Sequence, residues 1–170
     1  MEFLEKDLEQ IIYDADYEAL NNRGLQIFGK KKRQLKIGNY GICDIIYMSK
    51  PYFDKNRNMH YKGTISILEL KKDKIGVSTL FQALNYLKGV ISYLEKRKLS
   101  NEFNYKIILI GREIDLNSSF VYLNDLFPDN DYNTTFDISV TSINLYKYSY
   151  SIDGLEFNPI YNYKLIEEGF

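Results

Sequence analysis

Apolar residues recur at helical spacing in two stretches of the chain. The first covers residues 3–13, where one side carries Leu4, Leu8, Ile11 and Ile12 and the other side is acidic. We expect a helix that opens the chain and runs to about residue 19, before the turn-forming segment 21–24. The second stretch predicts a longer helix from residue 77 to about 98, whose apolar face comprises Val77, Leu80, Phe81, Leu84, Leu87, Ile91 and Leu94.

The other segments have the pattern of strands. Strand-like residues flank the basic run 30–33, and residues 40–48 and 64–70 are apolar and β-branched. A polar connection with Pro51 and Gly63 predicts a hairpin between these last two strands. Residues 105–111 are continuously apolar, which suits a strand buried on both faces. A short helix near 118–127 and β-rich segments from 136 onward, with a turn at 153–154, complete the order.

This order predicts an α/β fold in which a central mixed β-sheet is flanked by α-helices. We expect a right-handed crossover from strand 64–70 through the long helix to strand 105–111. The chain has 170 residues, 45% of them hydrophobic, which is enough for one well-buried core. We therefore expect a single domain, 1–170, with a motif-bearing core over about 2–111 and a β-rich C-terminal extension over about 112–170.

Charge and cysteine content narrow the classes of function. The 22 basic and 23 acidic residues give a formal net charge of −1, so a nucleic-acid partner must be held by a local basic patch. The single cysteine, Cys43, excludes a disulfide framework, and with only one histidine it excludes a zinc finger or HNH-type site within one chain. The acidic N-terminus is unlike a signal peptide, and no apolar run has membrane-spanning length. We expect a soluble, cytoplasmic protein.

Two otherwise apolar strands each carry one carboxylate: Asp44 in GICDII and Glu69 in ILELK. Side chains alternate along a strand, so Glu69 and Lys71 share a face. If the strands pair, Asp44 and Glu69 lie side by side, where they repel each other unless a cation sits between them. Oxygen ligands of this kind suit Mg²⁺ or Mn²⁺, and a nearby lysine could orient or deprotonate a water, or stabilise charge on a phosphate. The bland alternative is a solvated Glu69–Lys71 salt bridge.

Two helices add polar groups to this set. Glu5 and Glu9 lie one turn apart on the first helix, where either could complete a divalent-metal site or be an ordinary exposed carboxylate. On the long helix, Gln82 and Tyr86 lie four residues apart on a second, polar and aromatic stripe, which Gly89 and Tyr93 extend. We expect this stripe to be distinct from the apolar face. Its alternative role is only to cover surface.

Four motifs, and their order along the chain, resemble those of the PD-(D/E)xK nuclease superfamily, and most closely its RecB-like, NucS-type branch. They are the first glutamate of FLEKDLEQII at Glu5, GICD at 41–44, ELK at 69–71 and QALNY at 82–86. The resemblance spans about residues 2–98. Cys43 replaces the proline that names the superfamily, a change that many members tolerate. From about residue 112 onward no motif carries over.

The resemblance implies a restriction-endonuclease-like core and a divalent-metal-dependent endodeoxyribonuclease, a hydrolase of nucleic-acid phosphodiester bonds. It implies that Asp44 and Glu69 bind magnesium or manganese with help from the Leu70 carbonyl. Lys71 would serve the attacking water, and Glu5 would complete or tune the site. A metal would then explain why an apolar strand carries Glu69.

The resemblance also implies that Gln82 and Tyr86 orient the lysine or contact the phosphate backbone. Further contacts to the backbone of the DNA are expected from basic side chains. The candidates are Lys30, Lys31, Lys32, Arg33, Lys36, Lys72 and Lys74, followed by Lys88, Lys96 and Arg97. Each of these is otherwise a solvated surface charge.

Three alternatives stay open at the level of sequence. One is a catalytically inactive nuclease-fold module that binds nucleic acid or protein. The second is a cysteine hydrolase built on Cys43 and His60, although Cys43 lies in mid-strand and should point away from the face of Asp44. The third is that the protein acts as a homodimer, as nucleases that cut both strands often do.

Overall fold

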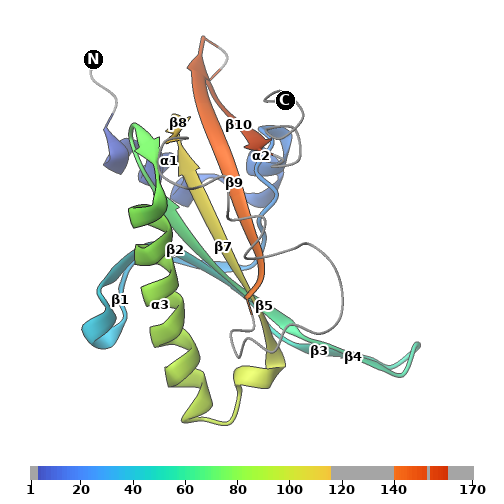
Figure 1. Ribbon diagram of the computed structural model, residues 1–170. Helices are drawn as coiled ribbons and strands as arrows, with labels where there is room; N and C mark the ends of the chain where they lie inside the picture. The colour runs from blue at the N-terminus through green and yellow to red at the C-terminus, as the bar shows by residue number, and fades with distance from the viewer. Residues whose placement is uncertain (1–3, 116–139, 153, 161–170) are drawn as a thin grey trace, which may run out of the picture.

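A computed structural model describes residues 4–115, 140–152 and 154–160 (Figure 1). At its centre lies a six-stranded sheet in the order β1-β2-β5-β7-β9-β10. β5, β7 and β9 run parallel to one another, and the remaining neighbours pair antiparallel. The strands are β1 (Lys30–Lys36), β2 (Ile42–Ser49), β5 (Gly63–Leu70), β7 (Phe103–Gly111), β9 (Val140–Ser151) and β10 (Gly154–Ile160).

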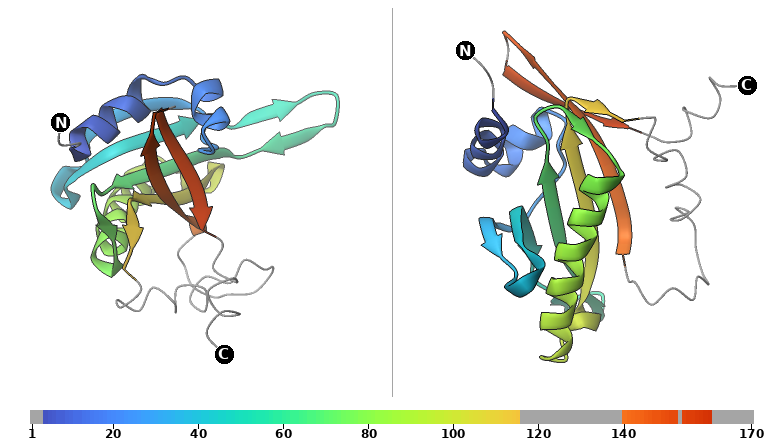
Figure 2. Two further views of the ribbon diagram at one scale, coloured as in Figure 1. Left: turned by 90° about the horizontal axis from the view of Figure 1, so that it is seen from above. Right: turned by 60° about the vertical axis from the view of Figure 1, so that its left-hand side comes forward.

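Helices cover both faces of this sheet. Figure 2 shows α1 (Glu5–Asp14) and α2 (Tyr17–Asn22) over one face and α3 (Val77–Glu95) over the other. The predicted α/β class, a central mixed sheet flanked by helices, is therefore confirmed. Smaller elements are the 3-10 turns η1 (Gly38–Tyr40) and η2 (Ser100–Glu102), the hairpin of β3 (Tyr52–Asp54) and β4 (Met59–Tyr61), and the pair of β6 (Lys74–Ile75) and β8 (Glu113–Ile114).

The opening helix is shorter than the sequence predicts, because the chain leaves helical geometry at Ala15 and starts a second helix. Ala15 is extended, with φ −65° and ψ 139°. Asp16 then caps α2, since its side chain accepts a hydrogen bond of 2.8 Å from the amide of Ala19. An aspartate at this position stabilises a new N-terminus and so favours the break over a continuous helix.

A hydrophobic core lies on each face of the sheet. Ile67, Leu87 and Ile107 are central to the core beneath α3, and Leu8, Leu68 and Ile110 are central to the core beneath α1 and α2. β5 contributes to both cores, since all six residues from 65 to 70 are buried. Because strands flank β5 and helices cover both faces of the sheet, most residues of β5 are apolar and even Glu69 is buried.

The buried side of α3 differs from the predicted apolar face. Its buried residues are Thr79, Leu80, Ala83, Tyr86, Leu87, Gly89 and Leu94. Phe81, expected in the core, is 65% exposed. The helix packs closely at Gly89, where a Cβ would lie 2.6 Å from atoms of both Ile37 and Tyr40. The lack of a side chain on glycine allows this close approach, which turns the Gly89 side of the helix toward the sheet. Tyr86 and Gly89 therefore belong to the buried face, not to a separate polar stripe.

The remaining expectations divide between confirmed and undescribed segments. The 50–63 connection contains the β3–β4 hairpin, and β2 pairs antiparallel with β5, as predicted. Residues 25–28 form no strand. The expected short helix near 118–127 and residue 153 of the expected turn lie outside the described residues. β9 and β10 continue the central sheet beyond β7. Among the described helices, none has both the length and the apolar character needed to cross a membrane.

Candidate functional site

The two strand carboxylates meet where β2 begins and β5 ends. The strands pair as the sequence predicts, from Ser49 with Thr64 to Ile45 with Leu68, so Asp44 and Glu69 each lie next to the last pair of this ladder. The amide of Leu70 donates a hydrogen bond of 2.9 Å to Oδ2 of Asp44. This bond fixes the Asp44 side chain over the end of β5, beside Glu69.

Glu69 is the unusual residue of this site, because its side chain is entirely buried. Its exposed fraction is 0%. Oε1 accepts a hydrogen bond of 3.0 Å from Nζ of Lys71. Oε2 is also buried and has no hydrogen-bond partner among the described residues. A buried carboxylate oxygen without a partner is costly, so this position favours the binding of an electropositive group.

Burial makes both carboxyl groups weaker acids. The pKa of Glu69 is raised to about 7, first by desolvation and then by the charge of Asp44, against the opposing effect of Lys71. The pKa of Asp44 is raised to about 6 by desolvation, against the Leu70 hydrogen bond and Lys71. A cation between the two groups would favour their ionised forms. The pair therefore provides oxygen ligands that become most available near and above neutral pH.

Lys71 places its charge among three carboxylates. Its Nζ lies 3.0 Å from Oε1 of Glu69 and 3.8 Å from Oε1 of Glu5. Partial burial alone would lower the pKa of Lys71, but the charge and hydrogen bond of Glu69, with Glu5 and Asp44, raise it overall. The side chain is thus a cation at neutral pH. This favours electrostatic stabilisation over proton abstraction as the role of Lys71.

Glu5 reaches the site from α1 and holds the backbone that follows Lys71. Its Oε2 accepts a hydrogen bond of 3.2 Å from the amide of Lys72. In addition, the hydroxyl of Tyr148 on β9 donates to the carbonyl oxygen of Lys72. The two peptide groups on either side of Lys72 are therefore held by residues from α1 and β9. The sequence offers no signal for Tyr148, because it is one of several alternating tyrosines in a β-rich segment.

Gln82 and Tyr86 come from α3 and bond to each other. Nε2 of Gln82 donates a hydrogen bond of 2.7 Å to the Tyr86 hydroxyl. The Tyr86 ring packs on Gly41, where a Cβ would lie 2.7 Å from a ring carbon. Burial raises the pKa of Tyr86, and the charges of Glu69 and Asp44 raise it further. Tyr86 thus borders the carboxylates, and among the described residues its hydroxyl bonds to Gln82 rather than to Lys71.

The Cys43–His60 pair does not form a site, because Cys43 on β2 lies beside the end of β5 and His60 on β4 lies before its start. The thiol of Cys43 lies 3.9 Å from the carbonyl oxygen of Leu68, near the end of the strand. His60 belongs to β4, which precedes the strand, and its Nε2 lies 3.3 Å from Glu102. Burial raises the pKa of the Cys43 thiol, and the nearby charges of Glu69 and Asp44 raise it further. A raised pKa disfavours the nucleophilic thiolate.

The basic residues of β1 divide into two groups. Lys31 donates to the carbonyl of Ala15 and Arg33 to Gln10, so both side chains bind the helical layer. Both also lie over the Tyr13 ring, at 5.5 Å and 5.4 Å from its centroid. Lys30, Lys32 and Lys36 are also exposed, and no hydrogen bond or ion pair to another described residue holds their side chains. Outside β1, Lys74 pairs with Glu113 at 3.7 Å.

The acidic groups do not make a ready-made side-chain cage for a metal. Across the described ranges, no group of three or more His, Cys, Asp or Glu side chains is arranged to hold one. Asp44 and Glu69 supply two side chains, so any further ligands would be backbone carbonyls, such as that of Leu70, or water. Mg²⁺ commonly binds with one or two carboxylates and several waters.

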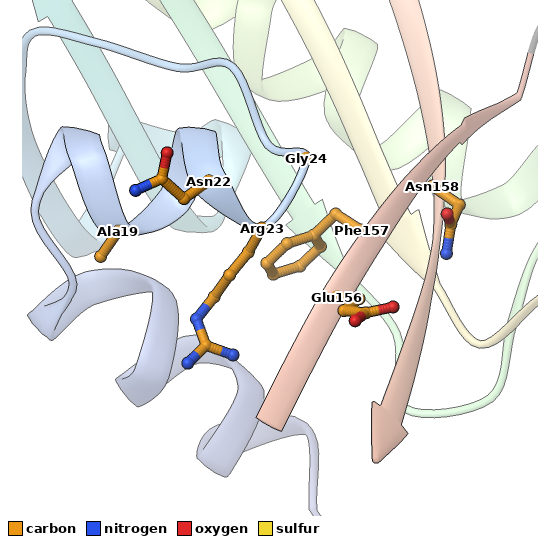
Figure 3. A pocket seen from close by; sticks show the side chains of 7 residues that line it. All are labelled: Ala19, Asn22, Arg23, Gly24, Glu156, Phe157 and Asn158. Carbon is orange, nitrogen blue, oxygen red and sulfur yellow. The ribbon is translucent and has the colours of Figure 1, made fainter. Parts of the chain in front are cut away.

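A separate hollow of about 580 Å³ lies between α2 and β10 (Figure 3). It is lined by Ala19, Asn22, Arg23, Gly24, Glu156, Phe157 and Asn158. Hydrogen bonds join the two sides of this hollow. Nη1 of Arg23 donates a hydrogen bond of 2.8 Å to the carbonyl of Leu155, and the Phe157 amide donates one of 2.7 Å to the Arg23 carbonyl. These bonds occupy the outer edge of β10. They protect an edge strand from pairing with another chain.

Comparison with known proteins adds no assignment to this geometry. Neither a scan of protein-family models nor searches of curated proteins and solved structures found a match to this chain.

Proposed function

We propose that this protein is a divalent-metal-dependent nuclease with a restriction-endonuclease-like core, and that its substrate is DNA. The observation that carries the proposal is the fully buried Glu69, whose Oε2 has no hydrogen-bond partner among the described residues. Asp44 on the neighbouring strand and Lys71 at 3.0 Å complete the set that the PD-(D/E)xK resemblance requires. A solvated salt bridge does not account for a glutamate with 0% exposure.

Asp44 and Glu69 are carboxylates that can both be ionised above neutral pH, so they fit a divalent cation. Carboxylate oxygens are the ligands that Mg²⁺ and Mn²⁺ prefer, and Asp44 and Glu69 would hold the ion, with the Leu70 carbonyl and water as further ligands. When bound, such an ion polarises a phosphoryl oxygen and makes a coordinated water more acidic. Burial raises the pKa of both carboxyl groups, and a cation between them would stabilise their ionised forms.

The other site residues have distinct roles in this proposal. Lys71, charged at neutral pH, stabilises the negative charge that develops on the scissile phosphate. Glu5 is a positioning residue, because it holds the Lys72 amide and lies 3.8 Å from Nζ of Lys71. The bonded pair of Gln82 and Tyr86 fixes the border of the site on the α3 side.

The test measures cleavage and affinity separately on single-stranded, duplex, flap and mismatched DNA. With Mg²⁺ or Mn²⁺, we expect cleavage by the wild type and a loss of at least about 100-fold in Asp44→Asn, Glu69→Gln and Lys71→Ala. With Ca²⁺ replacing Mg²⁺, Lys71→Ala should bind nearly as tightly as the wild type, because its charge acts mainly in the transition state. Glu18→Gln, which removes an exposed carboxylate of α2, is the matched control.

Two outcomes contradict the proposal in different ways. Binding without cleavage on every substrate form favours the inactive nucleic-acid-binding module. Reduced affinity with an unchanged rate in Lys71→Ala would make that lysine a phosphate contact, since it would then act equally in the ground state and the transition state. The same cleavage assay on RNA decides whether DNA is the right substrate class.

A further inference from the structure

The β3–β4 hairpin forms a two-stranded ribbon that projects from the sheet (Figures 1 and 2). Its strands pair Tyr52 with Tyr61 and Phe53 with His60. The turn is ordered by Asp54, whose Oδ1 accepts the amides of Asn56 at 2.9 Å and Arg57 at 3.2 Å. The ribbon is therefore a built structure rather than a loose connection between β2 and β5.

The ribbon and its two connections, residues 50–62, are locally basic. They carry Lys50, Lys55, Arg57 and Lys62 against the single acidic residue Asp54. All four basic residues are exposed. Because the whole chain has a formal net charge of −1, this segment concentrates positive charge that the molecule as a whole lacks.

The ribbon also exposes apolar side chains that join neither core. Tyr52 is 59% exposed, Phe53 52% and Met59 50%. Tyr52 stacks on Tyr61 with ring centroids 4.9 Å apart and an angle of 11° between planes. The pairing places Phe53 on the other face of the ribbon, since neighbouring residues of a strand point in opposite directions. Aromatic surface kept in solvent on both faces of a projecting element marks an interaction site.

We propose that the β3–β4 ribbon is an arm that binds single-stranded nucleic acid. Its lysines contact phosphates, and its exposed rings stack on unpaired bases. The combination of a positive backbone track with aromatic platforms is the general chemistry of single-strand binding. The positive charge of the ribbon favours a polyanion over a protein surface without acidic residues. The exposed rings favour a nucleic acid whose bases are unpaired and free to stack. The inference rests on the proposed function in one respect: the bound strand is the nuclease substrate or its extension.

The position of the arm sets a length requirement for the substrate. The ribbon joins the sheet at Gly63, and Glu69 lies near the other end of β5, which has eight residues. Gly63 and Glu69 are six residues apart, so at about 3.3 Å per residue the strand separates the arm from the carboxylates by about 20 Å. A strand stacked as in a duplex advances about 3.4 Å per nucleotide and so needs about six nucleotides to reach from one to the other. Shorter oligonucleotides should lose the contribution of the arm.

The first test removes charge from the arm and measures affinity by fluorescence anisotropy, with Ca²⁺ present and salt varied. The probe is a labelled single-stranded DNA of 20 nucleotides. The double variant Lys55→Gln with Lys62→Gln should bind more weakly. Its slope of log affinity against log salt should be smaller in magnitude by about 1.4, because two phosphate contacts are lost. The control is Lys98→Gln with Lys147→Gln, which removes the same charge from exposed positions outside the ribbon.

The second test removes an aromatic ring. Phe53→Ala should weaken single-strand binding by about 5-fold or more, because one base loses its stacking partner. The salt slope should not change. Duplex DNA of the same sequence should bind more weakly and be insensitive to Phe53→Ala, since its bases already stack on each other. Phe28→Ala, at a position that is 60% exposed on another part of the surface, is the matched control.

These measurements separate the arm from the nuclease site. Single-strand affinity that is equal in the wild type and both ribbon variants overturns the arm, even if the protein cleaves DNA with Mg²⁺. Reduced affinity in the ribbon variants supports the arm, even if no cleavage is found. Equal losses on single-stranded and duplex DNA in Phe53→Ala overturn base stacking. A change of oligomeric state in light scattering, without a change in affinity, assigns the ribbon to self-association instead.

Discussion

The buried carboxylate makes a prediction about folding that does not depend on any assay of activity. The perturbation is Glu69→Gln, which keeps the side-chain volume and an oxygen that can accept the hydrogen bond from Lys71. In the wild type the pKa of Glu69 rises from 4.5 to about 7 on folding. The folded protein therefore binds this proton more tightly than the unfolded chain does.

The sign and size of the effect follow from this difference. The stabilisation is complete below about pH 4.5 and is lost as the pH rises through the folded-state pKa of about 7. A tenfold change in proton affinity corresponds to about 1.4 kcal/mol, so the loss attributable to Glu69 is about 3 kcal/mol. Glutamine has no proton to release. The stability of Glu69→Gln relative to the wild type should therefore increase by about 3 kcal/mol between pH 4.5 and 7.5.

The assay is urea unfolding followed by circular dichroism at several pH values, with EDTA to remove divalent ions. Asp44, whose pKa is raised to about 6, adds a change of the same sign in both proteins, so the difference between them is the quantity to compare. Glu18→Gln should follow the wild type throughout. Mn²⁺ at about 100 times its dissociation constant should stabilise the wild type by about 2.7 kcal/mol and the Glu69→Gln variant by much less.

The reasoning is refuted if the stability difference between wild type and Glu69→Gln is the same at pH 4.5 and pH 7.5. That result would mean that groups of the chain itself compensate the Glu69 charge. A cation would then not be needed to compensate that charge, and Glu69 would not indicate a metal site.

Other predictions concern residues that support the site and the sheet. Tyr148→Phe removes the hydroxyl bonded to the Lys72 carbonyl; we expect a loss of about 1 kcal/mol in unfolding experiments and slower cleavage with unchanged DNA affinity. Gly41→Ala should cost about 1–3 kcal/mol, because φ there is 116° and the new Cβ would meet the Tyr86 ring; unchanged stability would contradict this. Arg23→Ala removes the bond to Leu155 and should speed amide exchange in β10 more than in β5, which hydrogen-exchange mass spectrometry can measure.

Local pattern was sufficient to predict most of the elements and the two strand carboxylates. Periodicity identified α3 and the buried strands β5 and β7, because a period of 3.6 or a continuous apolar run reflects what each element buries. The same alternation placed Glu69 and Lys71 on one face. The predictions of one continuous first helix and of a separate polar stripe on α3 were wrong, because the cap at Asp16 and the close approach at Gly89 depend on which of two locally acceptable geometries the rest of the fold selects.

Tertiary structure decided the character of the site. The sequence places Glu69 in an apolar strand, but only the packing of both sheet faces removes it from solvent and leaves Oε2 without a partner. Tyr148 reaches Lys72 across 76 positions of sequence, a contact that no local pattern encodes. Likewise, a run of four basic residues reads as one patch, yet Lys31 and Arg33 bind the helical layer because strand alternation turns them toward α1. Local chemistry is written in the order of residues, whereas burial and long-range contacts arise only when distant segments pack together.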